Sequence, residues 1–320
     1  MSSNLTSEKL LDVGNYFFKS IVKSIRRKIG KILLSIHAIL FLNTKGHDFT
    51  KQLTNCGNTP SLFDIVTICF NEDRFIKIQV QLLKKYIQDP FTHILADNST
   101  DKIKSERIKE IAKECQVGYI KIPSHHFKRN HSHAAAMHWV YKNVIRPRGR
   151  KFFGFIDHDI FPTAPIVLAD KMEHGVYGRP TPVYAKSGGV KERTKEYPYW
   201  SLWAGLLFIE NSLLKDTSIY KITFAPKVIG DGDFLDTGGG LWDSVYKNIP
   251  YPKKDFRFES VKFRATAGDR VQTDHYERHD EWLHLVNLSN WVETPEMEEK
   301  LTYFKELLAE KTGEDFSQLV

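Results

Sequence analysis

The stretch Phe152-Phe153-Gly154-Phe155-Ile156-Asp157-His158-Asp159-Ile160-Phe161-Pro162 decides how this chain of 320 residues is interpreted. Its apolar residues from 152 to 156 are typical of a buried β-strand, which ends where Asp157 and Asp159 become accessible. Ligands usually bind at the carboxyl ends of strands in an open α/β sheet. Two carboxylates there can hold Mg²⁺ and leave coordination positions for water and for the phosphates of a nucleotide-linked substrate. The alternative is that the Asp-x-Asp pair caps a turn.

The composition predicts a folded protein with a sizeable core, because 41% of the residues are apolar and 12% are aromatic. The three cysteines, Cys56, Cys69 and Cys115, are odd in number and have no Cys-x-x-Cys spacing. They indicate neither a disulfide framework nor a zinc site, and a reducing cytoplasm is the expected compartment.

The net charge of +7 is unevenly distributed along the chain. Residues 1–51 carry nine Lys or Arg and three acidic residues, which leaves 37 basic and 36 acidic residues for the remainder. The main domain is therefore almost neutral, and we expect no nucleic-acid partner.

The N-terminal extension, residues 1–50, contains a predicted basic amphipathic helix over residues 17–42, with apolar residues on one arc and Lys or Arg on the other. Its apolar run, residues 32–42, is shorter than the roughly 20 residues that span a bilayer. Two interpretations remain open. The helix lies on an anionic membrane surface, which would make the protein peripheral on the inner face of the cell membrane, or it packs on the main domain.

The main domain follows a predicted linker at residues 51–62. Strands are expected at 64–70, 91–96, 119–122 and 152–156, with helices at 75–86, 105–115 and 132–145 between them. This alternation predicts an α/β fold with a mostly parallel sheet and right-handed crossovers. Residues 63–165 form the first half of the domain and 166–293 the second, which includes a strand at 202–209 and a helix at 241–247. Residues 294–320 are a predicted surface helix.

Polar residues follow the first two predicted strands. Asn71-Glu72 comes after the first, and Asp97-Asn98-Ser99-Thr100-Asp101 comes after the second. A carboxylate at the second position can accept hydrogen bonds from a base or from ribose hydroxyls. The same segment is equally compatible with an Asx turn and a helix cap.

The order of these parts resembles the nucleotide-binding half of GT-A glycosyltransferases, particularly family 2, over about residues 63–165. The resemblance is carried by the two polar strand ends, by Asn-His-Ser-His-Ala-Ala-Ala at 130–136, and by Asp157-His158-Asp159. It implies a Rossmann-like GT-A fold that binds a nucleoside-diphosphate sugar. It further implies roles for the strand-end residues: Asn71, Glu72, Asp97 and Asn98 at the base and ribose, and Asp157 with Asp159 at the ribose and a Mn²⁺ or Mg²⁺ ion.

Beyond residue 165 the resemblance is thinner. The segment Trp203–Phe208 looks like the glycine-led strand beside the acceptor, but Glu210-Asn211 stands where the family usually has an Arg pair. Asp236 occupies the place of the residue that deprotonates the acceptor hydroxyl and is the candidate catalytic base; alternatively, it caps a glycine-rich turn. His284 resembles a C-terminal metal-binding histidine, with His275 and His279 as competitors.

Several other patterns have competing interpretations. The histidines at 125, 126, 131, 133 and 138 lack the spacing of a zinc site, and His131 and His133 are expected to line the donor pocket or cap a helix. A rival pair, Asp231 and Asp233, is flanked by glycines that indicate a turn. The aromatic residues Tyr197, Tyr199, Trp200 and Trp203 either contact an acceptor sugar or pack in the core.

The resemblance implies a metal-dependent hexosyltransferase that moves a sugar from a nucleoside diphosphate to a hydroxyl acceptor with inversion. The basic helix favours a saccharide or lipid-linked saccharide of a cell-envelope polysaccharide as acceptor. One alternative is a nucleotidyltransferase, although Cys69-Phe70-Asn71-Glu72 is not the Gly-rich basic loop that such enzymes normally have after the first strand. Another is a non-catalytic sugar-nucleotide binder or membrane scaffold.

Overall fold

A computed structural model describes residues 36–44, 61–128, 130–181, 183–186, 189–191, 198–230, 232–252, 257–262, 274–286 and 295–316. The chain divides into two units, residues 1–44 and 45–320. In the first, residues 36–43 are helical. The rest of the predicted basic helix, and all of the linker at 51–62 except its last two residues, lie outside the described residues. In the described part of the chain, no helix is both long enough and apolar enough to cross a membrane.

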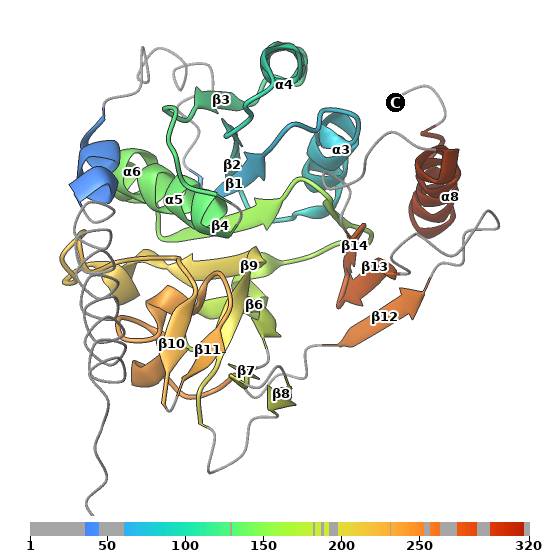
Figure 1. The fold of residues 1–320 in the computed structure, drawn as a ribbon. Coiled ribbons are helices and arrows are strands. Elements are labelled where there is room, and N and C mark those ends of the chain that lie inside the picture. Colours follow the sequence, from blue (N-terminus) through green and yellow to red (C-terminus); the bar gives the residue numbers. More distant parts are fainter. Residues whose placement is uncertain are drawn as a thin grey trace, which may run out of the picture. The chain divides into compact units, whose positions relative to one another are not determined.

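A six-stranded sheet forms the centre of the second unit (Figure 1). The four strands at one side run parallel, as predicted, whereas β9 runs antiparallel to both of its neighbours, β4 and β6. The predicted α/β class with a mainly parallel sheet is confirmed. In spatial order the strands are β3 (Gly118–Lys121), β2 (Phe91–Asp97), β1 (Phe63–Cys69), β4 (Phe152–Asp157), β9 (Ser201–Glu210) and β6 (Val176–Thr181).

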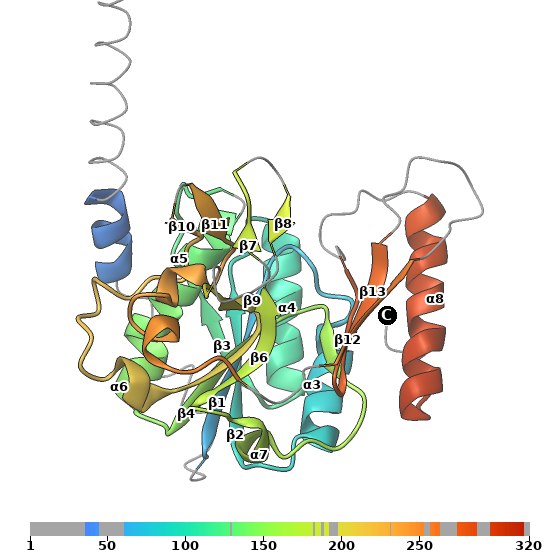
Figure 2. The same cartoon turned by 90° about the horizontal axis from the view of Figure 1, so that it is seen from below.

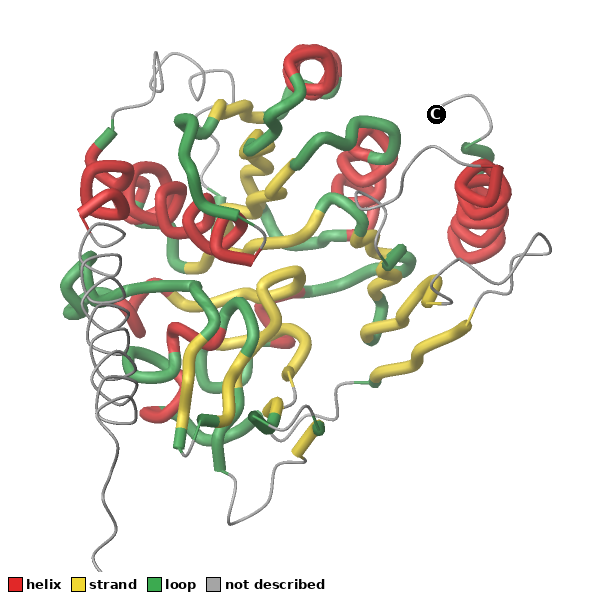
Figure 3. The backbone as a smooth tube through the Cα atoms, viewed as in Figure 1, coloured by secondary structure: helices red, strands yellow, loops and turns green. Residues whose placement is uncertain are grey.

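Helices cover both faces of this sheet. Helices α3 (Ile76–Tyr86) and α4 (Lys102–Glu114) lie on one face, and α5 (Asn130–Val140) lies on the other (Figures 1 and 2). Strand β1 is buried along its whole length because both of its faces are covered. Helix α5 continues as a π-turn, Tyr141–Ile145, and a short turn α6, Arg146–Arg148. The alternation of helix and strand is visible along the tube in Figure 3.

Helix α4 begins three residues earlier than the sequence pattern predicted. Asp101 is its N-cap, and the Asp101 carboxylate accepts hydrogen bonds from the backbone N–H groups of Ile103 (2.8 Å) and Lys104 (3.1 Å). These bonds satisfy donors that the first turn of a helix leaves free. The predicted cap in this segment is therefore present.

Two smaller antiparallel sheets flank the core. One has the order β10 (Lys227–Ile229), β11 (Asp233–Leu235), β7 (Val183–Tyr184), β8 (Val190–Lys191). The other has the order β12 (Phe258–Lys262), β13 (Asp274–His279), β14 (Trp282–His284), β5 (Ile160–Pro162). A short helix, α7 (Leu168–Lys171), lies between β5 and β6 in the chain.

The C-terminal helix α8 (Pro295–Thr312) agrees with the surface helix predicted there. Its apolar face packs in a cluster with residues of α3, β5 and β14, including Phe75, Phe161, Leu283 and Phe304. This packing fixes β14 beside β5, directly after the Asp-x-Asp motif.

The predicted helix at 241–247 is wrong. The structure has two short 3₁₀ turns, Gly239–Leu241 and Tyr246–Asn248. Gly238 has a left-handed backbone (φ 100°), and a Cβ on Gly240 would lie 2.5 Å from the carbonyl oxygen of Thr223. Close backbone packing at the glycines therefore replaces a regular helix here.

Candidate active site

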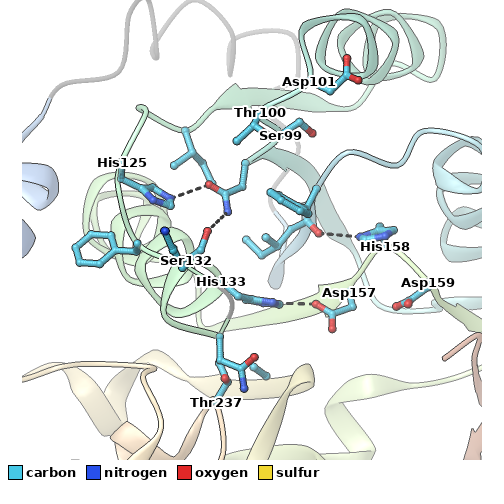
Figure 4. A pocket seen from close by; sticks show the side chains of 18 of the residues that line it. Ser99, Thr100, Asp101, His125, Ser132, His133, Asp157, His158, Asp159 and Thr237 are labelled. Atoms are coloured by element: carbon cyan, nitrogen blue, oxygen red, sulfur yellow. Dashed lines mark hydrogen bonds and ion pairs between the residues drawn. The ribbon is translucent and has the colours of Figure 1, made fainter. Parts of the chain in front are cut away.

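The carboxyl ends of the central strands open into a cleft of about 1650 Å³. Six of the predicted site residues line it, and Figure 4 shows several of them around the cavity. Three others, Asn71, Glu72 and Asp97, are outside its lining. The six that line it are Asn98, His133, Asp157, Asp159, Asp236 and His284.

The Asp-x-Asp motif forms the turn between β4 and β5. Asp157 ends β4, and Asp159 precedes Ile160, the first residue of β5. His158 between them is buried, and its Nδ1 lies 3.3 Å from the carbonyl oxygen of Ile68 on β1. The histidine thus anchors the turn to the sheet while both carboxylates line the cleft (Figure 4).

His284 reaches Asp159 through the pairing of β14 with β5. His284 is directly opposite Ile160 in this ladder, and the N–H of Leu285 donates to the carbonyl oxygen of Asp159 at 2.8 Å. As a result, Nε2 of His284 lies 3.6 Å from Oδ1 of Asp159. Of the three histidines considered for this position, His279 is also buried but does not line the cleft, and the side chain of His275 is outside the described residues.

The two carboxylates of the motif have different electrostatic surroundings. Burial raises the pKa of Asp157, against the attraction of His133, whose Nε2 is 3.4 Å from Oδ1 of Asp157. Burial also acts to raise the pKa of Asp159, but the positive charge of His284 outweighs it and lowers that pKa. Burial disfavours the His284 cation, yet Asp159 and Glu277 together raise the pKa of His284 to about 9.

Glu277 is a site residue that the sequence did not reveal. Its Oε2 lies 2.9 Å from Nδ1 of His284, and Arg179 donates to both carboxylate oxygens at 2.8 and 3.3 Å. Burial opposes ionisation, but the hydrogen bonds from His279 and His284 and the charge of Arg179 hold the pKa of Glu277 well below its ordinary range. A carboxylate on the second nitrogen of a histidine fixes the ring and leaves the first nitrogen for a metal.

Glu277, His279 and His284 could themselves hold an ion, because one ligand atom of each lies within 4.8 Å of the other two. The carboxylate of Glu277 is already engaged by Arg179 and His284, which favours a supporting role. Asp159 offers a better ligand, because its Oδ1 is buried and has no hydrogen-bond partner among the described residues. Two carboxylates and an imidazole are chemically suited to Mn²⁺ or Mg²⁺, and Asp157, Asp159 and Nε2 of His284 are therefore the candidate ligands for such an ion.

Gly205 on β9 gives Asp157 and Trp203 room to approach each other. A Cβ at this position would lie 2.4 Å from the Trp203 ring and 2.7 Å from Oδ2 of Asp157. Trp203 lines the cleft, and its ring centroid is 4.7 Å from that of His284 and 5.0 Å from the guanidinium of Arg179. Trp203 is therefore both a wall of the cleft and a support for the histidine.

The other aromatic residues considered for the acceptor site mostly pack internally. Trp200 is buried and packs on Tyr246, with ring centroids 4.8 Å apart. Tyr199 packs on Trp242 at 5.1 Å. Tyr197 is outside the described residues.

Asp97 does not line the cleft. Its buried carboxylate accepts hydrogen bonds from the backbone N–H of Ser99 (2.8 Å), from Tyr119 (2.9 Å), from Lys121 (2.9 Å) and from the hydroxyl of Ser105. Burial alone would raise the pKa of Asp97, but these hydrogen bonds outweigh burial and lower it. Direct contact of Asp97 with a nucleotide base stays a prediction. In the structure its carboxylate accepts a hydrogen bond from Lys121, which lines the cleft.

Asn71 and Asn98 hold the loop after β2. The Asn71 side-chain oxygen accepts from the N–H groups of Thr100 (2.9 Å) and Asp101 (3.0 Å). Asn98 donates to the Ser132 hydroxyl at 3.1 Å, and its oxygen lies 2.9 Å from Nε2 of His125. Asn98 therefore joins the loop to the start of α5, on which His133 lies.

Glu72 forms an ion pair with Arg74, whose Nε donates to it at 2.8 Å. Burial acts against the charge of Glu72, but the hydrogen bonds and charge of Arg74 outweigh it, and the pKa of Glu72 is lowered. Its predicted contact with a nucleotide stays a prediction.

Asp236 is half-buried and lines the cleft. Its Oδ1 accepts from the backbone N–H of Thr237 (2.7 Å) and from the side-chain amide of Asn130 (3.0 Å). The first contact is to the next residue in the chain, whereas the 3₁₀ turn that follows has Gly238 as its N-cap and no side-chain cap. The second contact connects Asp236 to the start of α5, and the catalytic role of Asp236 stays a prediction.

The rival acidic pair is Asp231 and Asp233, of which Asp233 does not line the cleft. Asp233 forms an ion pair with Lys191 at 2.6 Å, and Asp231 is outside the described residues. Gly230 and Gly232, with φ of 48° and 105°, make the turn that the glycines predicted.

The small sheet next to Asp236 has an exposed apolar row. Val228, Phe234, Tyr184 and Val190 are paired directly opposite one another across β10, β11, β7 and β8, so they share one face. Val228 is 71% exposed, Val190 60% and Phe234 38%, and the rings of Phe234 and Tyr184 are stacked 5.2 Å apart. Tyr184 also lines the cleft. Exposed apolar rows of this kind often mark binding surfaces.

Comparison with known proteins gave matches among solved structures alone. No family model matches the chain, and no curated protein does. The chain is similar to the mannosyltransferase PcManGT from Pyrobaculum calidifontis in complex with GDP-Man and Mn²⁺ (10% identity, TM-score 0.34), over 61% of this chain and 56% of the other. It is similar to the bifunctional glycosyltransferase WbbM (10% identity, TM-score 0.41), over 61% of this chain and 39% of that one.

A third similar structure is glucosyl-3-phosphoglycerate synthase from Mycobacterium tuberculosis with Mn²⁺, UDP and glucosyl-3-phosphoglycerate (12% identity, TM-score 0.33). The match covers 59% of this chain and 67% of the synthase. The chain thus spans little more than half of PcManGT and well under half of WbbM.

Proposed function

We propose that this chain is a metal-dependent glycosyltransferase of the GT-A fold, transferring a sugar from a nucleoside-diphosphate donor to a hydroxyl acceptor. The observation that carries the proposal is the placement of Asp157, Asp159, His284 and Asp236 around one cleft at the carboxyl ends of the sheet. The first three would be the ligands of a divalent ion, and Asp236 is a carboxylate suited to take a proton.

The chain's own residues divide into donor and acceptor groups. Asp157, Asp159 and Nε2 of His284 would hold Mn²⁺ or Mg²⁺, which when bound neutralises charge on the diphosphate leaving group. The loop held by Asn71 and Asn98, with Lys121, would bind the nucleoside. His133, whose Nε2 lies 3.4 Å from Oδ1 of Asp157, would lie beside the diphosphate.

On the acceptor side, Asp236 would accept the proton of the attacking hydroxyl at a carboxylate oxygen. Direct attack on the sugar from the face opposite the diphosphate would invert the configuration. The stacked rings of Tyr184 and Phe234 begin at the cleft and favour a saccharide acceptor, since flat apolar rings suit the CH faces of sugars. A hexose donor and a lipid-linked or envelope polysaccharide acceptor are proposals based on the sequence resemblance and on the basic N-terminal segment.

The test begins with donor binding. Wild-type protein is screened for thermal stabilisation by UDP-, GDP- and dTDP-sugars with and without Mn²⁺, because a ligand that binds the folded state raises its melting temperature. We expect one nucleotide to stabilise the protein, and only with the metal. Release of the nucleoside diphosphate is then measured for wild type, Asp159→Ala and Asp233→Ala.

Asp159→Ala should lose metal-dependent release, and Asp233→Ala, whose carboxylate is paired with Lys191, should keep it. Full turnover in Asp159→Ala would exclude the proposed mechanism. Release of pyrophosphate in place of a nucleoside diphosphate would indicate a nucleotidyltransferase, and binding without any turnover would indicate a non-catalytic binder.

The membrane part of the proposal has its own test. Removal of residues 1–50 should abolish co-sedimentation with vesicles that contain anionic phospholipid, if the basic segment binds lipid. Unchanged co-sedimentation of the truncated chain would exclude this role.

A further inference from the structure

Gln79 on helix α3 makes two hydrogen bonds to the metal-binding turn from inside the core. The side chain is fully buried, and its amide nitrogen donates to the carbonyl oxygens of Asp157 and Ile160, both at 2.7 Å. These two carbonyls bracket the turn that contains His158 and Asp159. One side chain therefore holds both ends of the turn, Asp157 and Ile160.

The direction of the Gln79 amide is fixed by Thr67 on β1. The Thr67 hydroxyl donates to Oε1 of Gln79 at 2.7 Å, and the Thr67 oxygen lies 2.8 Å from Nε2 of His93 on β2. Because the hydroxyl has a single hydrogen and gives it to Gln79, His93 must be the donor to Thr67. The resulting chain of donors runs from His93 through Thr67 and Gln79 to the two carbonyls of the turn.

Two further contacts hold the turn at residues between Asp157 and Ile160. His158 contacts the carbonyl of Ile68, and the N–H of Leu285 donates to the carbonyl of Asp159. Neither contact fixes the carbonyl groups of Asp157 and Ile160. Without Gln79, both carbonyls would lose a buried donor and the turn would shift to recover one.

We propose that Gln79 is a positioning residue that sets the separation of the Asp157 and Asp159 carboxylates, and so the affinity of the site for its divalent ion. This inference rests on the proposed function, because it assumes that the two carboxylates bind a metal. The reason is geometric: a metal site needs its ligands within a few tenths of an ångström, and Gln79 links the two ends of the segment that carries them.

The test measures binding of Mn²⁺ alone to the full-length protein by electron paramagnetic resonance, which reports free and bound ion separately. Gln79→Leu is compared with wild type and with Gln81→Leu, a matched change on the exposed face of the same helix. We expect the Kd for Mn²⁺ to rise about tenfold or more in Gln79→Leu, as for other residues that support metal ligands. Gln81→Leu should bind as wild type.

Thr67→Val provides a second variant, which removes the hydroxyl that orients the amide and leaves Gln79 in place. We expect a smaller rise in Kd, and this variant decides the question if Gln79→Leu does not fold. A folded Gln79→Leu that melts at a lower temperature but binds Mn²⁺ as wild type would overturn the inference. If Gln79→Leu does not fold, an unchanged Kd for Mn²⁺ in Thr67→Val would overturn the inference. Wild-type protein that binds no Mn²⁺ would overturn the metal site itself, and this inference with it.

Discussion

Nε2 of His284 lies 3.6 Å from Oδ1 of Asp159, although the two residues are far apart in the sequence. The pairing of β14 with β5 makes this possible, because His284 is opposite Ile160 in the ladder. The packing of helix α8 behind the two strands supports that pairing. The C-terminal segment therefore completes a site that begins at the end of β4.

Replacement of His284 by Ala should weaken Mn²⁺ binding at least as much as the 10- to 100-fold that is usual for loss of a supporting residue, because a proposed direct ligand is removed. Isothermal titration with Mn²⁺ measures the effect. His174→Asn is the control, since His174 is partly exposed and outside the cleft lining, and Asn tolerates its positive φ of 54°. Equal Mn²⁺ affinity in His284→Ala and wild type would remove His284 from the ligand set.

Glu277 should affect the metal through His284. Glu277→Ala removes the acceptor for Nδ1 of His284 and the partner of Arg179, and we expect the Kd for Mn²⁺ to rise roughly 10- to 100-fold. Glu277→Gln keeps an oxygen that can accept from Nδ1 and should recover much of the affinity. If Glu277 were itself a ligand, Gln would bind the ion poorly, and the two variants would be equally impaired.

Gly205 should tolerate no side chain. In Gly205→Ala the new Cβ would collide with the Trp203 ring and with Oδ2 of Asp157. Overpacking of this kind typically costs about 1–3 kcal/mol of unfolding free energy, and it would also displace Asp157, a proposed metal ligand. Urea denaturation and Mn²⁺ titration measure the two effects. In Gly189→Ala, where a Cβ meets nothing within 4 Å, neither quantity should change. A Gly205→Ala protein as stable as wild type would show that Trp203 can move aside.

The sequence predicted the parallel part of the sheet because each strand there is a short apolar run between amphipathic helices. The sequence did not indicate the direction of β9. A strand covered on both faces is uniformly apolar whether it runs parallel or antiparallel, and the segment Leu202–Ile209 therefore indicated a strand without indicating its direction. The helix predicted at 241–247 failed because the close backbone contacts of Gly238 and Gly240 depend on distant segments.

The site could be predicted where it is local in sequence. Asp157 and Asp159 adjoin a strand end, and a strand end is visible as the limit of an apolar run. Glu277 was missed because its partner, His284, is placed by the β13–β14 hairpin, whose turn contains Asp280 at a φ of 51°. Asp97 was predicted to contact the nucleotide only because it lies at the end of the second predicted strand. The donors that occupy its carboxylate come from α4 and β3, and no local pattern shows them.

The stability of the protein should fall in acid partly through His93. Burial, with a smaller effect of Lys84, lowers the pKa of His93 to about 3, so the folded state keeps the ring neutral. The unfolded chain binds a proton near pH 6.5, and unfolding is favoured increasingly as the pH falls from 6.5 towards 3. The stabilising contribution of the neutral His93 ring is complete above pH 6.5. Each pH unit below 6.5 lowers the free energy of unfolding by up to about 1.4 kcal/mol.

His93→Gln offers the comparison for this effect, because a Gln amide can still donate to Thr67 but does not titrate. Urea denaturation from pH 7 to 4 should give a shallower loss of unfolding free energy in the variant. Other buried histidines, such as His138 with a pKa lowered to about 4 chiefly by burial, act in both proteins and cancel in the difference. Parallel pH profiles for the two proteins would show that His93 is not protonated on unfolding in this range.

Asp236→Asn separates the acceptor half of the site from the donor half. The Asn side chain keeps an oxygen for the hydrogen bonds from Thr237 and Asn130 but cannot take a proton at pH 7. We therefore expect the donor nucleotide and Mn²⁺ to bind as in wild type, with the turnover number for sugar transfer reduced by about 10²- to 10⁴-fold. Asp233→Asn, outside the cleft lining, should leave both unchanged. If Asp236→Asn instead retains transfer, the Asp236 carboxylate is not the catalytic base. The base would then have to be sought among the other groups that line the cleft.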